Sequence, residues 1–306
     1  MTGNRARRIL ALALLFASVT YVVWRLLSDD EAIDALFSIS PVTALGLVVL
    51  QVVYLIPQAF RYRLAVEHTT DTSIPWGEWL RLFLIGRFLN TLIPQAGNAY
   101  RGLRLKEDHG IPITRYLGGF LAFTWLSTIM NLSLAIIVIL VLEPSLMIGQ
   151  LPALVVTGGT LVIATASPPL ALLLIRQFRP EQGFWGWAYR RFEDLLGATV
   201  SIARSRSTLA VFSAVGFVGF CVAIAIFGVS MSALNLDTSA SAVVLFFVLL
   251  QLATYVNLTP GNLGVLEIGF GALGSQLGIG GVGGLLVAAV VRGAGRVAGW
   301  CVGVAS

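Results

Sequence analysis

Long runs of apolar residues without a charged side chain constrain this chain more than any other feature of its sequence. Most of these runs approach or exceed the roughly 20 residues that a helix needs to cross a bilayer. They cover Ile9–Trp24, Val42–Phe60, Leu117–Leu142, Leu151–Ile175, Thr208–Leu234 and Gly280–Val291. With 57% hydrophobic and 11% charged residues, the chain lacks the polar surface of a soluble domain. We therefore predict an all-α polytopic membrane protein with about six full transmembrane helices.

The basic residues are distributed as the positive-inside rule expects of such a protein. By this rule the cytoplasmic side carries Arg5, Arg7 and Arg8, Arg61 and Arg63, and the six arginines of segment 176–206. The net charge of +5 thus indicates membrane orientation and not a nucleic-acid partner. We predict a multi-pass protein of the cell membrane with a cytoplasmic N-terminus. The first run is expected to be a span and not a signal peptide, because no small-residue cleavage site follows Leu27.

Segment 176–206 also predicts a cytoplasmic amphipathic linker. Its apolar and charged residues alternate, which is typical of a helix that lies on a membrane surface. The apolar set is Phe184, Trp185, Trp187, Phe192, Leu195 and Leu196, and the charged set is Arg190, Arg191, Glu193 and Asp194. Anchoring to the surface is the simpler interpretation, and contact with anionic lipid headgroups is the alternative.

Two segments do not fit as simple spans, because Pro and Gly break each of them midway. They lie near 78–107 and near 242–276. The breaking pairs are Pro94 with Gly97 and Pro260 with Gly264. Pro removes a backbone donor and Gly tolerates positive φ, so each pair predicts a tight reversal. Inside a bilayer the freed backbone groups need protein or water as partners. We therefore predict two re-entrant hairpins.

The two broken segments also match one another. Asn90 precedes Gly97 by seven residues, as Asn257 precedes Gly264, and a charged residue follows each motif, Arg101 in the first and Glu267 in the second. By the charge pattern the first segment enters from inside and the second from outside. This predicts an inverted repeat of residues 42–142 and 208–304, an architecture that builds a midplane site from half-helices. Chance similarity of so short a match is the alternative.

The stretches Arg87–Arg101 and Leu258–Glu267 resemble the lysylphosphatidylglycerol synthase transmembrane region family. This family is the flippase-like membrane domain of the bacterial multiple peptide resistance factor and also occurs as stand-alone proteins. The resemblance covers roughly Leu12 to Gly303. It implies that the chain moves a membrane phospholipid, aminoacylated or otherwise modified, between leaflets through a cavity lined by the two hairpins.

Two departures from the family pattern affect what the resemblance implies. The family often has a Glu-Arg pair early in the span after the first hairpin, where this chain has Thr124 and Trp125. The soluble aminoacyl-transfer domain of the resistance factor does not follow, since the sequence ends at Ser306. We therefore expect that the chain has no synthase activity and is not an enzyme. The identity of the lipid stays open.

Five charged residues are expected at membrane depth, where each costs at least about 2.5–3.5 kcal/mol at a helix centre. Arg87 and Arg101 flank the first turn, and their guanidinium groups suit the geometry of a lipid phosphate. Reaching to the cytoplasmic interface is the alternative and is favoured for Arg101. Glu267 is the expected counter-ion of Arg292, either as a structural pair or as a headgroup site. Arg296 is expected to reach the interface.

The candidate headgroup site combines these charges with the residues of the two turns, of which Asn90 and Asn257 are expected to cap half-helices or to satisfy carbonyl groups of the turns. It comprises Arg87, Asn90, Pro94, Gly97, Arg101, Asn257, Pro260, Gly264, Glu267, Arg292 and Arg296. We expect no catalytic residues, metal or cofactor. The Gly-rich stretch Gly278–Gly284 lacks the Lys-Ser/Thr of a phosphate loop and indicates close helix packing.

Three functions remain open from the residues alone. The first is a lipid flippase with a headgroup cavity between the hairpins. The second is an ion- or proton-coupled small-solute transporter that uses Glu267. The third is a non-catalytic membrane subunit of a lipid-modifying system. The sequence also leaves a homodimer open.

Overall fold

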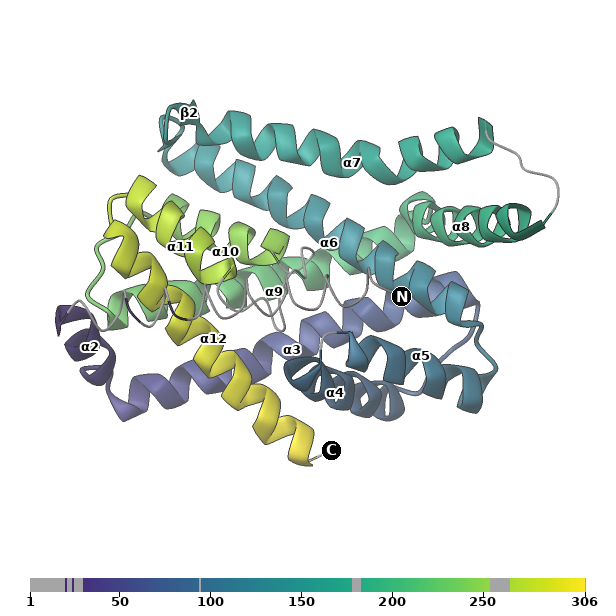
Figure 1. Cartoon of the computed structure of the whole chain (residues 1–306), viewed down its shortest axis with the longest axis horizontal. Helices are drawn as coiled ribbons and strands as arrows, with labels where there is room; N and C mark the ends of the chain where they lie inside the picture. Colours follow the sequence, from purple (N-terminus) through teal and green to yellow (C-terminus); the bar gives the residue numbers. More distant parts are fainter. Residues whose placement is uncertain are drawn as a thin grey trace.

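Helices make up nearly all of the computed structural model, which describes Thr20, Trp24 and residues 30–93, 95–177, 183–253 and 265–305. They are α2 (Asp30–Phe37), α3 (Pro41–Thr70), α4 (Trp76–Leu92), α5 (Ala96–His109), α6 (Ile113–Leu142), α7 (Ala153–Gln177), α8 (Gly183–Ser201), the 3-10 helix η1 (Ile202–Arg204), α9 (Arg206–Ala233), α10 (Ala240–Ala253), α11 (Val265–Gln276) and α12 (Gly280–Ala305) (Figure 1). Most of the first predicted span lies outside the described residues, as do Pro94, Asn257, Pro260 and Gly264.

Five helices of the described part are long and apolar enough to cross a membrane, namely α3, α6, α7, α9 and α12. They correspond to five of the predicted spans, so the all-α polytopic class is confirmed. The loop between α6 and α7 departs from it only locally. There the two-residue strands β1 (Met147–Ile148) and β2 (Leu151–Pro152), which were not predicted, pair antiparallel.

Two of the spanning helices extend well beyond the apolar runs that predicted them. α3 continues to Thr70, so Arg61 and Arg63 lie within the helix, and their position on the cytoplasmic side stays a prediction. Arg63 pairs with Glu67 at 3.0 Å, one helical turn further on, and such pairs support a helix. α12 likewise continues through Arg292 and Arg296 to Ala305. An apolar run in the sequence ends at the first charged residue, whereas the helix itself continues past that residue.

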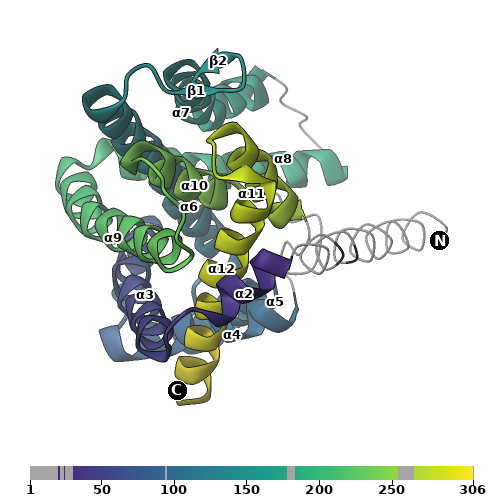
Figure 2. The same cartoon turned by 90° about the vertical axis from the view of Figure 1, so that its left-hand side faces the viewer.

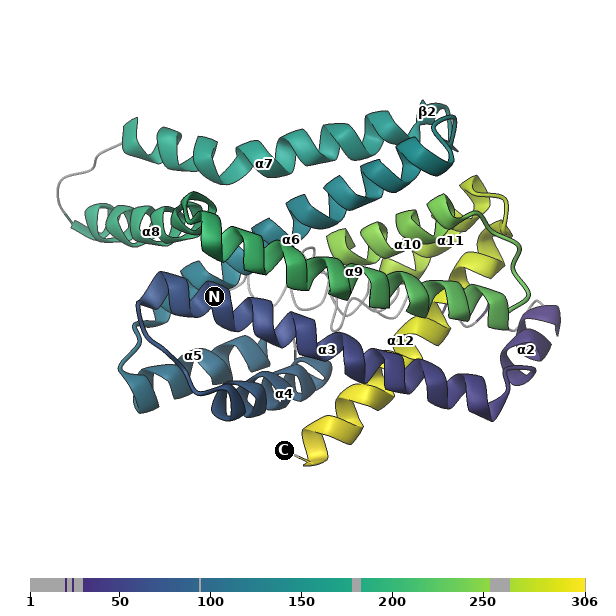
Figure 3. The same ribbon diagram turned by 180° about the vertical axis from the view of Figure 1, so that it is seen from behind.

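The order of one long helix, two short helices and one long helix occurs twice along the chain. The first set is α3, the pair α4 and α5 (the first helix pair), and α6. The second set is α9, the pair α10 and α11 (the second helix pair), and α12. The first helix pair lies at the end of the molecule where α3 ends, and the second lies at the opposite end (Figures 1 and 3). A hydrogen bond of 2.6 Å from Ser239 Oγ, just before α10, to Glu143 Oε2, just after α6, fixes that opposite end.

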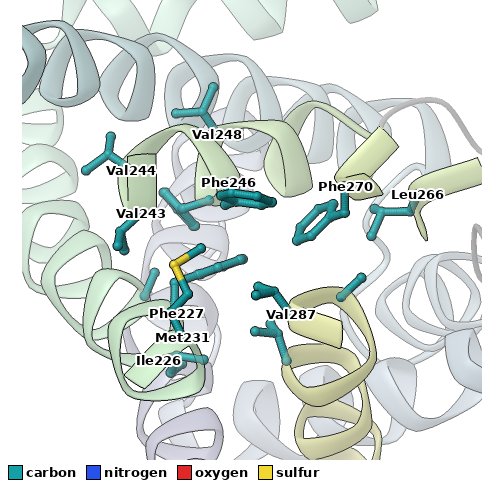
Figure 4. Packing of buried hydrophobic residues seen from close by; sticks show 14 of the residues in the cluster. Ile226, Phe227, Met231, Val243, Val244, Phe246, Val248, Leu266, Phe270 and Val287 are labelled. Atoms are coloured by element: carbon teal, nitrogen blue, oxygen red, sulfur yellow. The ribbon is translucent and has the colours of Figure 1, made fainter. Parts of the chain in front are cut away.

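A core of apolar side chains joins α9, α10, α11 and α12 (Figure 4). The rings of Phe246 and Phe270 lie 5.3 Å apart, and Phe227 packs beside them. In lipid, close van der Waals contact between helices replaces the hydrophobic effect as the main attraction. Here Gly284 provides that contact, because a Cβ at this position would overlap the carbonyl oxygen of Phe270. The predicted close packing is confirmed at Gly281, Gly283 and Gly284, whereas a Cβ at Gly278 or Gly280 would meet open space.

α12 connects the two ends of the molecule, since it runs from the second helix pair across α3 towards α4 (Figure 2). Gln51 of α3 donates a hydrogen bond of 3.1 Å to the carbonyl oxygen of Val291 in α12. Further along, Gly303 faces the Phe88 ring of α4 so closely that a Cβ would lie 2.6 Å from the Cβ of Phe88. α12 therefore holds both helix pairs in a fixed relation to α3.

The segment predicted as an amphipathic linker contains α8, which packs on the first half of α6. A Cβ at Gly118 of α6 would lie 3.0 Å from the Cβ of Ala198, so the two helices touch closely. Thr199 Oγ1 also donates to the carbonyl oxygen of Gly118 at 3.4 Å. The helix within this segment is thus confirmed, whereas its position on a membrane surface stays a prediction.

Candidate functional site

The first helix pair closes on two glycines. A Cβ at Gly97 in α5 would overlap the carbonyl oxygen of Gly86 in α4, so the two backbones touch. Gly97 was predicted to supply the positive φ of the turn, and this is wrong. Gln95, the residue before α5, takes that conformation with φ of 65°. The glycine is needed for close approach and not for the reversal itself.

Asn90 ties the end of α4 to the start of α5. Its side-chain Oδ1 accepts a hydrogen bond of 2.8 Å from the backbone N–H of Gly97. The first N–H groups of a helix have no partner within the helix, and a side-chain oxygen from the preceding helix here satisfies one of them. The prediction that Asn90 caps a half-helix is confirmed.

Arg101 lies buried inside the first helix pair, with 4% of its surface exposed. Its Nε donates to the carbonyl oxygen of Gly97 at 3.1 Å, and its Nη2 donates to Asn98 Oδ1 at 2.7 Å. The guanidinium also lies over the rings of Tyr62 and Phe83, at 5.0 and 5.6 Å from their centroids. The prediction that Arg101 reaches the cytoplasmic interface is therefore wrong. α5 turns this side chain inward, where carbonyl dipoles and aromatic faces solvate the cation.

Arg87 stands on the opposite limb of the pair and is half-buried. It lies close enough to Arg101 for the two positive charges to repel one another, and it lies near the hydroxyl of Tyr54 in α3. Among the described residues, neither arginine has a carboxylate within ion-pair distance. The first helix pair thus carries one arginine on each limb, Arg87 in α4 and Arg101 in α5, and their joint contact with one phosphate stays a prediction.

In the second helix pair, an ion pair neutralises the buried charge. Glu267, in the first turn of α11, forms an ion pair with Arg292 of α12, which confirms the predicted counter-ion. Glu267 is buried, and the side chain of Arg292 is 14% exposed. A negative charge is also favoured at the N-terminus of a helix, because the backbone dipoles there are positive. Arg296, one turn beyond Arg292, is exposed and takes no part in the ion pair between Glu267 and Arg292.

Sequence reasoning missed a row of polar residues on α3, namely Gln51, Tyr54, Gln58 and Arg61 (the α3 polar stripe). Arg61 is buried, with its guanidinium over the rings of Phe123 and Phe212 at 5.6 and 5.1 Å. Gly216 of α9 leaves room for it, since a Cβ there would lie 2.7 Å from Arg61 Nη1. The spacing of three, four and three residues within an apolar run was the available signal.

The sequence matches the family described as the lysylphosphatidylglycerol synthase TM region over residues 8–303, nearly the whole chain. The chain belongs to this family. Comparison with curated proteins and with solved structures gives no match. Membership agrees with a multi-pass membrane domain and with the resemblance carried by the two broken segments.

One departure from the pattern of the lysylphosphatidylglycerol synthase TM region now has a structural context. Trp125, at the position where the family often has a charged pair, donates its indole Nε1–H to the carbonyl oxygen of Ala164 at 2.8 Å. This bond joins α6 to α7. Position 125 in this member therefore serves packing between α6 and α7.

Two cavities of the described residues lie outside the region between the two helix pairs, where a cavity was expected. One described cavity, of about 490 Å³, lies between the end of α3, the start of α6 and α8. A smaller one, of about 190 Å³, lies between α7 and α8. Within the same residues, no group of three or more His, Cys, Asp or Glu side chains could hold a metal. A passage between the helix pairs stays a prediction.

Proposed function

We propose that this chain is a lipid flippase, which moves a modified phospholipid or a lipid-linked headgroup between leaflets and catalyses no covalent reaction. The observation that carries the proposal is the pairing of buried charges with short helices between membrane spans. Arg101 and Glu267 both lie within two turns of the tips of such helices. Charged groups at membrane depth are costly and mark substrate pathways in transporters.

The geometry supports re-entrant hairpins in an inverted repeat. The four short helices have 17, 14, 14 and 12 residues. At 1.5 Å per residue they extend roughly 18–26 Å, which is less than the ~30 Å hydrocarbon core. The two helix pairs start from opposite ends of the molecule, so their tips converge towards its middle (Figures 1 and 3). A flippase needs such a polar midplane site while the acyl tails stay in lipid.

The charged side chains of the two helix pairs are complementary to the phosphate and the amine of a single headgroup. Arg87 and Arg101 offer guanidinium forks without a carboxylate partner in the described structure, and a lipid phosphate would compensate both. Glu267 offers a carboxylate that an amine on the headgroup would compete for with Arg292. An aminoacylated phospholipid carries both a phosphate and an amine, and the family name refers to such a lipid.

We propose the same orientation that the charge pattern predicts, with a cytoplasmic N-terminus in the cell membrane. The partners would be membrane phospholipids and not nucleic acid. A homodimer is a further proposal, which mass measurement of the chain in lipid nanodiscs would test. A mass of one chain per disc at all protein concentrations would exclude it.

A leaflet-exchange measurement tests the proposal. The full chain is reconstituted into vesicles that carry an acyl-labelled lipid, and dithionite then bleaches the label in the outer leaflet. The lipids are aminoacylated phosphatidylglycerol, phosphatidylethanolamine, phosphatidylglycerol and labelled polar lipids of the host. We expect complete bleaching at a rate well above that of protein-free vesicles for at least one of them. Bleaching that stops at half of the label for every lipid would overturn the proposal.

A second function, proton-coupled transport of a small solute, is favoured by one observation. Glu267 is a buried carboxylate on a short helix, and its pairing with Arg292 would be released by protonation. A solute flux that depends on the proton gradient and disappears in Glu267→Gln would support this function. Leaflet exchange that proceeds without a proton gradient would favour the flippase.

A further inference from the structure

The cavity of about 490 Å³ at the end of α3 is separate from the charged groups of both helix pairs. Its volume lies within the range of about 300–1,000 Å³ that is typical of small-molecule sites. Three elements enclose it, the last turn of α3, the first turn of α6 and one face of α8. Its polar lining includes Asp71, Thr114, Arg115, Arg191 and Asp194.

Charges of both signs face this cavity without neutralising one another. Two arginines and two aspartates line it, so their formal charges sum to zero. Within the described residues, Arg115, Asp71 and Asp194 make no ion pair within 4 Å. Arg191 donates to the hydroxyl of Thr114 at 3.5 Å across the cavity wall. All four residues are exposed, so their charges are accessible to a ligand that enters the cavity.

Arg115 and Asp71 each carry a charge of the sign that the dipole of their own helix disfavours at that end. Arg115 lies in the first turn of α6, where the backbone dipoles are already positive. Asp71 is the C-cap of α3, where the dipoles are already negative. Each placement costs stability, and each concentrates one sign of charge on one wall of the cavity. Arg115 thus places a positive charge at the α6 wall and Asp71 a negative charge at the α3 wall, while α8 contributes one charge of each sign, Arg191 and Asp194.

The orientation proposed above places the cavity at the depth of lipid headgroups. α3 and α6 have 30 residues each, about 45 Å of helix against a hydrocarbon core of about 30 Å. In that orientation the end of α3 and the start of α6 project into the polar layer, beside α8. A lipid headgroup is the ligand of highest local concentration at this position.

We propose that this cavity binds a zwitterionic phospholipid headgroup, with its phosphate towards Arg115 and Arg191 and its ammonium towards Asp71 and Asp194. A headgroup with a phosphate but no amine would meet two uncompensated carboxylates. The site is one of binding, and it does not depend on whether the chain moves lipid between leaflets.

Native mass spectrometry of the full chain in detergent micelles tests the assignment. The probes are phosphatidylethanolamine and phosphatidylglycerol with identical acyl chains, and soluble glycerophosphoethanolamine. We expect more retained phosphatidylethanolamine than phosphatidylglycerol. Asp71→Asn should lower the retained phosphatidylethanolamine about two- to fivefold, the effect of one partly exposed ion pair, and leave phosphatidylglycerol unchanged or raised. Asn tolerates the left-handed backbone at position 71, where φ is 52°, so the fold should persist.

Arg115→Gln should lower retention of both lipids, because it removes a phosphate partner. Arg104→Gln is the matched control, since Arg104 is an exposed arginine of α5 that pairs with Glu107 and does not line the cavity. Binding of glycerophosphoethanolamine that competes with the lipid would assign recognition to the headgroup, and its failure to bind would assign part of it to the acyl chains. Equal retention of both lipids by the unchanged chain, or loss in Arg104→Gln equal to that in Arg115→Gln, would overturn the proposal.

Discussion

The two helix pairs occupy corresponding positions in the two halves of the chain, yet they hold buried charge by different means. In the first, Arg101 is solvated by the Gly97 carbonyl, by Asn98 and by aromatic rings, all of them neutral. In the second, Glu267 is neutralised by Arg292 of α12. The first pair therefore keeps a net positive charge that an anion can use, whereas the second is neutral until its ion pair opens.

This difference also determines how much stability each helix pair loses when one of its charged side chains is removed. Breaking a buried ion pair leaves an uncompensated charge, which costs about 3–5 kcal/mol. Removing a cation that is held by neutral groups leaves only unsatisfied acceptors, at about 1–3 kcal/mol. The expected effects therefore fall in that order.

Glu267→Ala should have the largest effect on stability, about 3–5 kcal/mol, because it strands Arg292 in a buried site. The free energy of unfolding in mixed micelles measures it. The double variant Glu267→Gln with Arg292→Gln should recover most of the loss, since neither side chain is then charged. If Glu267→Ala were as stable as the unchanged chain, the ion pair between Glu267 and Arg292 would not be desolvated.

Arg101→Met should cost less, about 1–3 kcal/mol, because it leaves Asn98 and the Gly97 carbonyl without their donor but strands no charge. The same unfolding measurement applies, with Arg104→Met on the exposed face of α5 as the control. If Arg101→Met were costlier than Glu267→Ala, the contrast between the two helix pairs would be lost.

Gly97→Ala should destabilise the first helix pair by about 1–3 kcal/mol through overpacking against Gly86. Gly77→Ala is the matched control, because a Cβ at that position of α4 meets open space. It should be neutral or slightly stabilising, as Ala favours helix more than Gly does. Equal effects of the two substitutions would show that the glycine contact does not hold the pair together.

Asn90→Ala should have the smallest effect, about 0.5–2 kcal/mol, the usual cost of a lost helix cap. Protection of the Gly97 amide from hydrogen exchange should fall with it, which ties the loss to the cap itself. Thr91→Ala tests the neighbouring position, where the exposed hydroxyl bonds only within α4. Unchanged protection of Gly97 in Asn90→Ala would contradict the cap.

The membrane class, five spans, the cap at Asn90 and the pairing of Glu267 with Arg292 could all be predicted from the sequence. Each depends on a local pattern or on a simple choice, since Glu267 was the one acid among the predicted charges at membrane depth. Arg61 and Arg101 could not be placed, because the groups that solvate them come from other helices. Gly97 was misread for the same reason, since its partner Gly86 is recognised only once the helices cross.

Leaflet exchange in one matched pair of variants tests the central claim most directly. Arg101→Met removes the buried cation of the first helix pair, and Arg104→Met removes an exposed cation of the same helix. With equal amounts of folded protein in the vesicles, we predict that Arg101→Met slows the exchange of an acyl-labelled phospholipid at least about tenfold, the effect of losing one charge-assisted phosphate contact. Arg104→Met should leave the rate unchanged. Equal rates for Arg101→Met, Arg104→Met and the unchanged chain would contradict the claim that the buried charge carries a lipid headgroup across the membrane.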